Sequence, residues 1–441
     1  MVFFILLILS ILLPNTIFAQ NNFGLHLTQT SDINSAHSII NSSNGDWGWA
    51  TIVIRLDQIN DKNTWQDFFN NCRKHHIIPI IRLATKMENN HWAKPSETDI
   101  DQFVNFLESL NWPSKTRHLI LFNEINHATE WGGEVNVAEY VDIVLYAQQK
   151  FKTTNPDYFI MPAALDLAAP NQSPKFLSYQ EIYRQIKNYK PEFFEKFDGL
   201  ANHYYPHNSP NTYQNELLYF PNKNIPVFIT ETAIPHREGI KKNNNFYTLN
   251  TSVSILKNLI LNYQNNSQIK AVTPFIYNYP YPPFDNFSWV DKDEKLYPQF
   301  QHIIDLPKET NEPEQITSFK KIKHEIPLII FTGKEYYGHV YMENTGQSIW
   351  GENNFCLKSE SKNIISQDLC TDEHLILPNQ IKIFSFKFTV QNPSNFKEET
   401  YLKWEGLPKI KIMPINASAT IYRPKTGILN IIINFIQKLI K

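Results

Sequence analysis

Short apolar runs alternate with amphipathic stretches from about residue 23 to residue 302 of the chain. Four of the intervening stretches repeat apolar residues at the helical spacing i, i+3 and i+4, which predicts helices at 64–75, 100–110, 137–152 and 251–263. The apolar runs predict eight strands, at 23–27, 51–56, 77–83, 118–123, 157–163, 197–203, 225–231 and 269–277. Near-continuous apolar strands that alternate with helices are typical of a parallel sheet covered by helices.

Eight such units in about 280 residues match the size of a (β/α)8 TIM barrel, so we expect an α/β barrel over residues 20–305. A doubly wound sheet is the competing fold. That fold binds nucleotides through a glycine-rich loop after its first strand. The corresponding segment here, FGLHLTQTS (23–31), has no such loop, and the barrel is favoured.

The pattern changes after the predicted barrel. Residues 306–325 are polar and contain Pro307 and Pro313, which predicts a linker. Short strands separated by turns, without helical spacing, then predict a small all-β sandwich over residues 326–424. Within it, ENTGQSIW (343–350) resembles the Asn-x-Gly…Trp signature of bacterial Ig-like domains, and this resemblance implies an Ig-like sandwich.

Both ends of the chain are apolar. The run Val2–Leu13 is short for a bilayer span and fits the core of a secretory signal peptide, residues 1–19, with cleavage after Ala19. No lysine or arginine precedes the run, so an uncleaved anchor is the alternative. Residues 425–441 predict an amphipathic helix that either contacts a membrane surface or packs on the sandwich or a partner. We therefore expect a secreted or cell-surface protein.

Composition narrows the partners. The net charge is -2 and there is no basic stripe, which argues against nucleic acid. Aromatic residues make up 14% of the chain, which suits stacking on sugars but equally suits cores and interfaces. An oxidising compartment could join Cys356 to Cys370, whereas Cys72 is predicted to be a lone buried thiol. No spacing of cysteines or histidines predicts a metal site, and no cofactor is expected.

Polar side chains close most of the predicted strands, and catalytic residues of barrels come from such carboxyl ends. The fourth and seventh strands each end in a glutamate, Glu124 and Glu231. Carboxylates at the ends of hydrophobic strands are costly unless they are paired or used, so two of them favour a site. The other residues at strand ends are Arg55, Arg82, Asn123, His203, Tyr204 and Tyr205, and the eighth strand runs through Tyr277 toward Trp289.

These residues resemble a known family over residues 23–305. FNEIN (122–126) resembles the Asn-Glu acid/base motif of clan A retaining glycoside hydrolases, and VFITETA (227–233) resembles their nucleophile strand. HYY (203–205) is similar to the His-x-Tyr pair of several of these families. Arg55 and Trp289 match the arginine of strand two and the tryptophan of strand eight, although Trp289 lies a dozen residues beyond the apolar run.

The resemblance implies a retaining reaction in which Glu231 is the nucleophile and Glu124 the acid/base. Asn123 would then bind the sugar 2-hydroxyl, while Arg55 and Tyr205 would hold Glu231 ionised and oriented.

The remaining assignments are less specific. His203 would orient Glu124 or bind substrate, with a neutral core histidine as the alternative. Arg82 is either a second sugar contact or a buried partner of a carboxylate. Among aromatic residues near strand ends, the expected sugar contacts are Trp131, Tyr277 and Trp289.

The sequence thus predicts a secreted retaining glycosidase that cleaves β-glycosidic bonds of an oligo- or polysaccharide. The alternative is a non-catalytic carbohydrate-binding or adhesion protein on the same scaffold. A serine hydrolase or nucleotide enzyme is disfavoured, because the chain has no G-x-S-x-G motif and no phosphate-binding loop.

Overall fold

The computed structural model describes residues 21–237, 246–325, 327, 329–331, 334–351, 356–359, 364–366, 369–370, 375–390, 402–405 and 420–422. The predicted signal peptide (1–19) and C-terminal helix (425–441) lie outside these residues. The chain divides into two compact units, Met1–Glu314 and Gln315–Lys441. Among the helices that the structure describes, none is long and apolar enough to cross a membrane.

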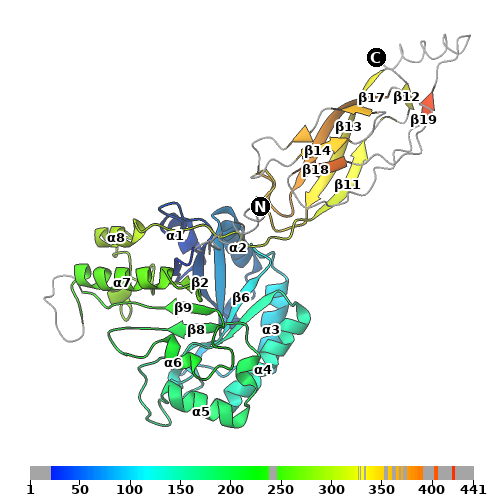
Figure 1. Ribbon diagram of the computed structural model, residues 1–441. Helices are drawn as coiled ribbons and strands as arrows, with labels where there is room; N and C mark the ends of the chain where they lie inside the picture. Colours follow the sequence, from blue (N-terminus) through cyan, green and yellow to red (C-terminus); the bar gives the residue numbers. More distant parts are fainter. Residues whose placement is uncertain are drawn as a thin grey trace, which may run out of the picture. The chain divides into compact units, whose positions relative to one another are not determined.

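The first unit contains two parallel sheets (Figure 1), one with the strand order β1-β2-β3-β6-β7 and one with the order β10-β9-β8. Parallel bridges from Phe23 to Val272 and from Asp166 to His203 join the sheets at both of their edges. The predicted α/β fold with parallel strands is therefore confirmed. The strands are β1 (Gly24–His26), β2 (Gly48–Arg55), β3 (Ile77–Ala84), β6 (Arg117–Leu121), β7 (Tyr158–Pro162), β8 (Leu200–His203), β9 (Val227–Glu231) and β10 (Ile269–Val272), with a small hairpin of β4 (Met87–Glu88) and β5 (His91–Trp92).

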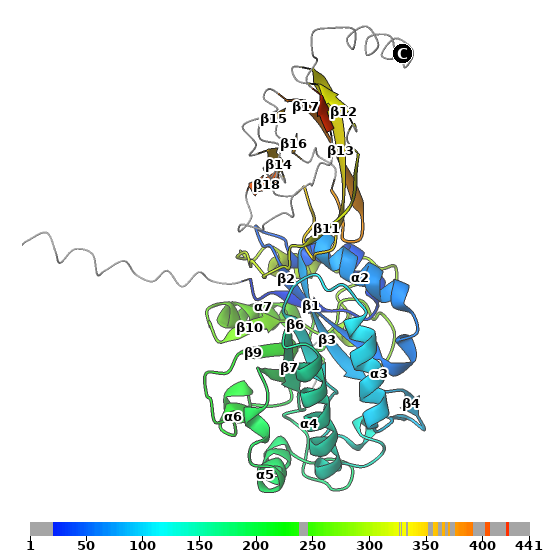
Figure 2. The ribbon, with the colours of Figure 1, turned by 90° about the vertical axis from the view of Figure 1, so that its right-hand side faces the viewer.

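Helices lie around the outside of these strands (Figures 1 and 2). Their starts are fixed by polar caps: Ser96 and Asp99 form a capping box at α3, and Thr248 caps α7. The helices are α1 (Ile33–Ile40), α2 (Lys62–Lys74), α3 (Glu97–Glu108), α4 (Val137–Thr154), α5 (Tyr179–Tyr189), α6 (Tyr213–Leu217), α7 (Leu249–Gln264) and α8 (Gln301–Ile304). The predicted lone thiol, Cys72, is buried and free on α2.

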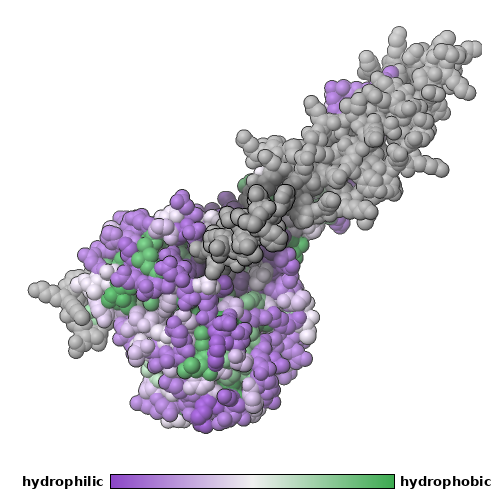
Figure 3. Space-filling model, in the orientation of Figure 1, coloured by the Kyte–Doolittle hydropathy of each residue, from purple (hydrophilic) through white to green (hydrophobic). Residues whose placement is uncertain are grey.

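Side chains of the strands alternate between two apolar layers, as strand geometry requires. Residues that face the helices join the large core, whereas their neighbours form an inner cluster between the strands. Every strand from β2 to β10 in the two sheets contributes to the inner cluster, through Trp49, Ile78, Ile80, Ile120, Met161, Ala201, Phe228 and Ala271. On the face in Figure 3, hydrophilic residues dominate the surface of this unit and hydrophobic ones form small separate patches.

The predicted linker over 306–325 is wrong at both ends. Leu306 and Lys308 are buried in the first unit, where Lys308 Nζ donates to the carbonyl of Ile304 at 2.8 Å. Residues Phe319–Glu325 form a strand, β11, which pairs with β13 (Glu335–Asn344) in the second unit. Lysine-rich edge strands need few apolar residues, so β11 lacks the hydrophobic pattern that identifies a strand in sequence.

All elements described in the second unit are strands. One antiparallel sheet has the order β11-β13-β17-β15, and two smaller sheets have the orders β16-β14-β18 and β12-β19. The register of β14 and β16 places Cys356 opposite Cys370, as a disulfide between them would need, and that bond stays a prediction. The remaining strands are β12 (Ile329–Phe331), β14 (Cys356–Ser359), β15 (Ile364–Ser366), β16 (Leu369–Cys370), β17 (Ile381–Val390), β18 (Leu402–Glu405) and β19 (Thr420–Tyr422).

We predict that His118→Phe makes the protein less sensitive to acid. His118 lies on the inner layer against the rings of Trp49, Phe159 and Phe228, and burial lowers the pKa of its imidazole to about 3. In the unfolded chain the same group titrates near 6.5, so unfolding takes up a proton between these two pH values. The folded state therefore loses stability as the pH falls through this window, by about 2 kcal/mol at pH 5.

Urea unfolding at pH 5 and pH 8 measures this loss. The difference in the free energy of unfolding between the two pH values should shrink by that amount in the variant. It should stay at the wild-type value in His302→Gln, where the substituted histidine is exposed on α8. Equal pH dependence in His118→Phe and wild type would contradict the prediction.

Candidate active site

A cavity of about 370 Å³ opens at the carboxyl ends of the parallel strands, a size typical of small-ligand sites. Its wall combines charged, amide and aromatic side chains. The lining residues are Arg82, Leu83, Ala84, Thr85, Trp92, Ala93, Phe122, Asn123, Glu124, Glu130, Trp131, Asp166, Tyr205, Asn208, Glu231, Phe275, Phe284 and Phe287.

Glu231 reaches this cavity because the strand register shifts beside it. Ala201 pairs with Phe228, and both side chains belong to the inner layer. Strict alternation would place Glu231 on the outer face, toward the helices. The pairing instead skips Thr230 and sets Glu231 opposite His203, so that both end on the inner face. A one-residue irregularity of this kind re-aims a side chain.

Four side chains surround the carboxylate of Glu231, which is 6% exposed. Arg82 Nη1 donates to its Oε1 at 2.5 Å, and the Tyr205 hydroxyl donates to its Oε2 at 2.8 Å. The Nε2 atoms of His26 and His203 each lie 3.7 Å from Oε1. Both oxygens of this buried acid are therefore bonded.

This environment keeps Glu231 ionised. Burial alone would raise the pKa of its carboxyl, but His203, Arg82, His26 and the Tyr205 hydrogen bond together lower it well below the usual range. Burial lowers the pKa of His26 to about 3, so His26 is neutral near pH 7. The permanent positive charge beside Glu231 therefore comes from Arg82, and His203 adds a second one when it is protonated.

Glu124 lies in the turn after β6, where the backbone is strained. Phe122 has a φ of 75° and Glu124 a φ of 27°, values that cost non-glycine residues on the order of 1–3 kcal/mol. The turn is held by a hydrogen bond from the Glu124 amide to the carbonyl of Ala164, 2.9 Å long. Such strain persists where the surrounding structure fixes it, and here it presents the Glu124 side chain to the cavity.

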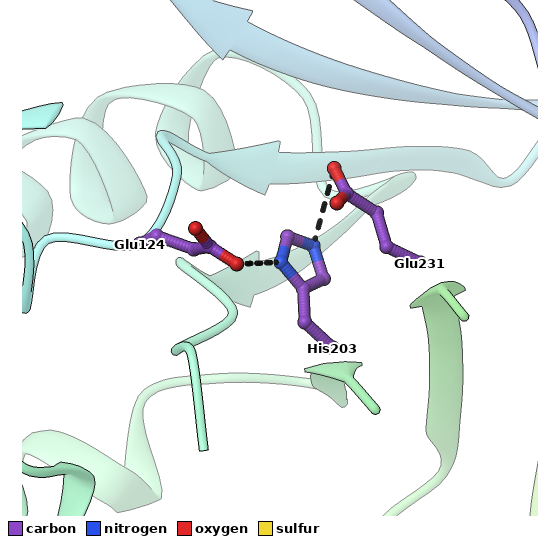
Figure 4. Close-up of side chains that lie close together, drawn as sticks. All are labelled: Glu124, His203 and Glu231. Carbon is purple, nitrogen blue, oxygen red and sulfur yellow. Dashed lines mark hydrogen bonds and ion pairs between the residues drawn. The ribbon is translucent and has the colours of Figure 1, made fainter. Parts of the chain in front are cut away.

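His203 lies between the two glutamates (Figure 4). A hydrogen bond of 2.8 Å joins its Nδ1 to Glu124 Oε1, while its Nε2 faces Glu231. Burial alone would lower the pKa of this imidazole, but Glu231 and Glu124 raise it above the ordinary value. An oxygen of Glu124 and one of Glu231 lie within 4.8 Å of each other. The site thus holds one buried, ionised carboxylate beside a second carboxyl that is bonded to a protonatable group.

Glu124, His203 and Glu231 are close enough to be considered as metal ligands. The oxygen of Glu231 that faces His203 already accepts a hydrogen bond from the Arg82 guanidinium, and His203 Nδ1 is bonded to Glu124. A cation would have to displace the positively charged Arg82, so this set fits a proton-transfer site better than a metal site.

The structure brings six of the predicted site residues together. Asn123, Glu124, Trp131, Tyr205 and Glu231 line the cavity, and His203 connects the glutamates. Arg82 resolves to one of its two predicted roles, that of a buried carboxylate partner. It also donates to Asn123 Oδ1 at 2.7 Å and so fixes the orientation of that amide.

The expectation that Arg55 holds Glu231 is wrong. Arg55 is 44% exposed and donates to Asp57 at 2.9 Å. The strand register places Val53, not Arg55, level with Arg82. Arg55 therefore lies two residues farther along its strand, about 7 Å beyond the level of the site.

Two of the predicted sugar contacts are also corrected. Trp289 is 1% exposed and stacks on Phe300 at 4.2 Å, and Tyr277 is buried in the core; neither lines the cavity. Trp131 does line it, but at 2% exposure against Phe122 and Tyr140 it is part of the wall rather than an open stacking face.

Sequence reasoning missed several polar residues of the site. Glu130 lines the cavity, as does Asp166, which pairs with His127 at 2.8 Å. The only signal in the sequence was position: Glu130 lies in the loop after the Asn123-Glu124 motif, and Asp166 shortly after the fifth strand. His26 ends β1 and carries no motif.

No family model matches the chain, and no curated protein matches it. Solved structures with a similar fold include an endo-beta-1,3-glucanase from Pseudomonas viridiflava, at 12% identity and a TM-score of 0.43, where the match covers 65% of this chain and 98% of that one. A monomeric beta-xylosidase from Caulobacter crescentus matches at 10% identity and a TM-score of 0.46, covering 85% and 98%. A glucosidase from Croceicoccus marinus matches at 8% identity and 0.47, covering 85% and 97%. At such low identities and TM-scores, these similarities carry no inference about activity, which has to come from the site itself.

Arg82→Gln is expected to lower the free energy of unfolding by about 3–5 kcal/mol, because it leaves Glu231 buried without its closest charged partner. Arg55→Gln is the matched control, since it removes the same side chain from an exposed pair and should cost less than about 1 kcal/mol. Urea unfolding at neutral pH compares the two variants. A loss at Arg55 as large as that at Arg82 would contradict the assignment of the carboxylate partner.

Proposed function

We propose that this chain is a glycoside hydrolase that cleaves β-glycosidic bonds of an oligo- or polysaccharide with retention of configuration. The observation that carries the proposal is the pair of glutamates, with oxygens within 4.8 Å of each other across His203, in a cavity at the strand ends. Retaining glycosidases hold two carboxyl groups roughly 5–5.5 Å apart, whereas inverting enzymes need about 6.5–9.5 Å to admit water. The close pair therefore favours retention.

The proposed mechanism assigns a different task to each glutamate. Glu231, ionised and held by Arg82 and Tyr205, attacks the anomeric carbon and forms a glycosyl-enzyme. Glu124 gives a proton to the departing oxygen and then removes one from the incoming water. His203 bonds Glu124 and orients it through both steps. Asn123 lines the cavity beside them, where its amide can donate to the sugar 2-hydroxyl.

The proposal also covers the barrel, the second unit and the two ends of the chain. We propose that the eight parallel strands close into a (β/α)8 barrel, which is supported by the bridges that join the two sheets at both edges. The Asn-x-Gly…Trp motif supports an Ig-like assignment of the second unit. The apolar run Val2–Leu13 supports secretion, and the pattern of residues 425–441 supports contact with a membrane surface.

A mechanism-based label tests the proposal. A panel of 2-deoxy-2-fluoro β-glycosides with good leaving groups should include one that inactivates the protein. The fluorine slows both formation and hydrolysis of the glycosyl-enzyme, whereas the good leaving group speeds only its formation, so the intermediate accumulates. Mass spectrometry of peptic fragments should then find the sugar on Glu231. Glu231→Gln should take no label, and Glu134→Gln, which changes an exposed glutamate nearby, should label like wild type.

A label on any other residue would overturn the assignment of the nucleophile. Glycan binding without labelling or hydrolysis would instead support a non-catalytic carbohydrate-binding protein.

A further inference from the structure

We propose that the reacting subsite takes an uncharged sugar, and that Glu130 is the residue that enforces this choice by accepting sugar hydroxyls and repelling sugars that bear a carboxylate. The inference rests on the proposed glycosidase function and deepens it by naming the substrate class.

Carboxyl groups dominate the charge of the cavity wall. Of the described lining residues, Glu124, Glu130, Asp166 and Glu231 are acidic and only Arg82 is basic. The Arg82 guanidinium already donates to Glu231 and Asn123. Two lysines directly follow lining residues in sequence. Lys86 pairs with Glu88, and Lys94 pairs with both Glu134 and Glu139. A uronic acid would therefore meet a wall of carboxyl groups and no cation uncommitted to the protein among the described lining residues.

Glu130 ends the short helix η3 (Ala128–Glu130), whose turn is closed by a bond from its amide to the carbonyl of His127. Its Oε2 accepts a hydrogen bond from Asn123 Nδ2 at 3.2 Å, while the oxygen of the same amide accepts from Arg82. Glu130 thus ends a chain of bonds that leads to Glu231. No ion pair joins Glu130 to a cation in the described part of the chain. Burying a carboxyl beside a second one, Glu124, without a cation as partner is unfavourable. Its presence here therefore indicates a role toward a ligand.

Glu130 changes its ionisation near neutral pH. Burial and the neighbouring Glu124 raise the pKa of its carboxyl to about 7, against the lowering effect of Asn123 and Arg82. The other charged groups that face it are Glu231, across the cavity, and His127. Because the raised pKa belongs to an acid, Glu130 is mostly neutral below pH 7 and negative above it. Repulsion of acidic sugars should therefore grow as the pH rises through 7.

Aromatic rings form a second part of the cavity wall. Phe275, Phe284 and Phe287 pack edge to face, and Phe284 remains 40% exposed at the cavity. Trp92 adds another ring. The C–H face of an uncharged pyranose suits such rings, and its hydroxyls suit the carboxyl groups, so the two halves of the wall fit the same ligand.

The test compares aryl β-glycosides that differ only at C6, glucoside with glucuronide and galactoside with galacturonide, together with the xyloside and mannoside. We expect wild type to favour the uncharged member of a pair in kcat/KM by about 100-fold or more, and the ratio to rise between pH 6 and pH 8. Glu130→Gln keeps a carbonyl that can accept from Asn123 but removes the charge. It should narrow the ratio about tenfold and remove its rise with pH. Glu195→Gln, at an exposed glutamate that has no part in the cavity, should leave the ratio and its pH dependence unchanged.

Preference for a uronide in wild type, or an unchanged ratio in Glu130→Gln, would overturn the inference. If no glycoside is cleaved, the proposed function fails, and affinity electrophoresis of wild type decides the inference separately. Retardation by neutral glucan or xylan but not by polygalacturonate supports it. Retardation by polygalacturonate, or by none of these polymers, overturns it.

Discussion

The functional end of this protein depends on keeping one buried carboxylate, that of Glu231, ionised. Taking a carboxylate out of water is unfavourable unless charges and hydrogen bonds replace the lost solvent. Arg82, Tyr205 and His203 supply these from the ends of β3 and β8. This requirement explains why polar residues follow the apolar inner cluster toward the carboxyl ends of the strands. Arg82 lies two residues after Ile80 on β3, and His203 lies two residues after Ala201 on β8.

The same network extends beyond Glu231 in two directions. Through His203 it reaches Glu124, so the position of the proposed acid/base depends on the group that also stabilises the proposed nucleophile. Through Arg82 and Asn123 it reaches Glu130 at the cavity wall. Three carboxyl groups therefore belong to one network of hydrogen bonds, and the proposed mechanism requires different environments for Glu124 and Glu231.

Much of this arrangement was predictable from sequence, because strand ends are recognisable. The periodicity of 118–123 and 225–231 predicted two strands, and the glutamates that follow or end them do meet. The partner of Glu231 was not predictable in this way. Choosing Arg82 over Arg55 requires the register between β2 and β3, which no residue in either strand encodes by itself. The role of Glu130 and the strand β11 were not predicted for a related reason. Both depend on neighbours distant in sequence, and the residues themselves are those of an ordinary loop.

The anomeric configuration of the first product shows whether the two close glutamates act as a double-displacement pair. Proton NMR spectra recorded within minutes of adding enzyme to a cleavable β-glycoside distinguish the two anomers before mutarotation mixes them. We expect the β-anomer to appear first and the α-anomer to follow at the spontaneous rate. Initial formation of the α-anomer would mean direct displacement by water, and would contradict the assignment of Glu231 as a nucleophile.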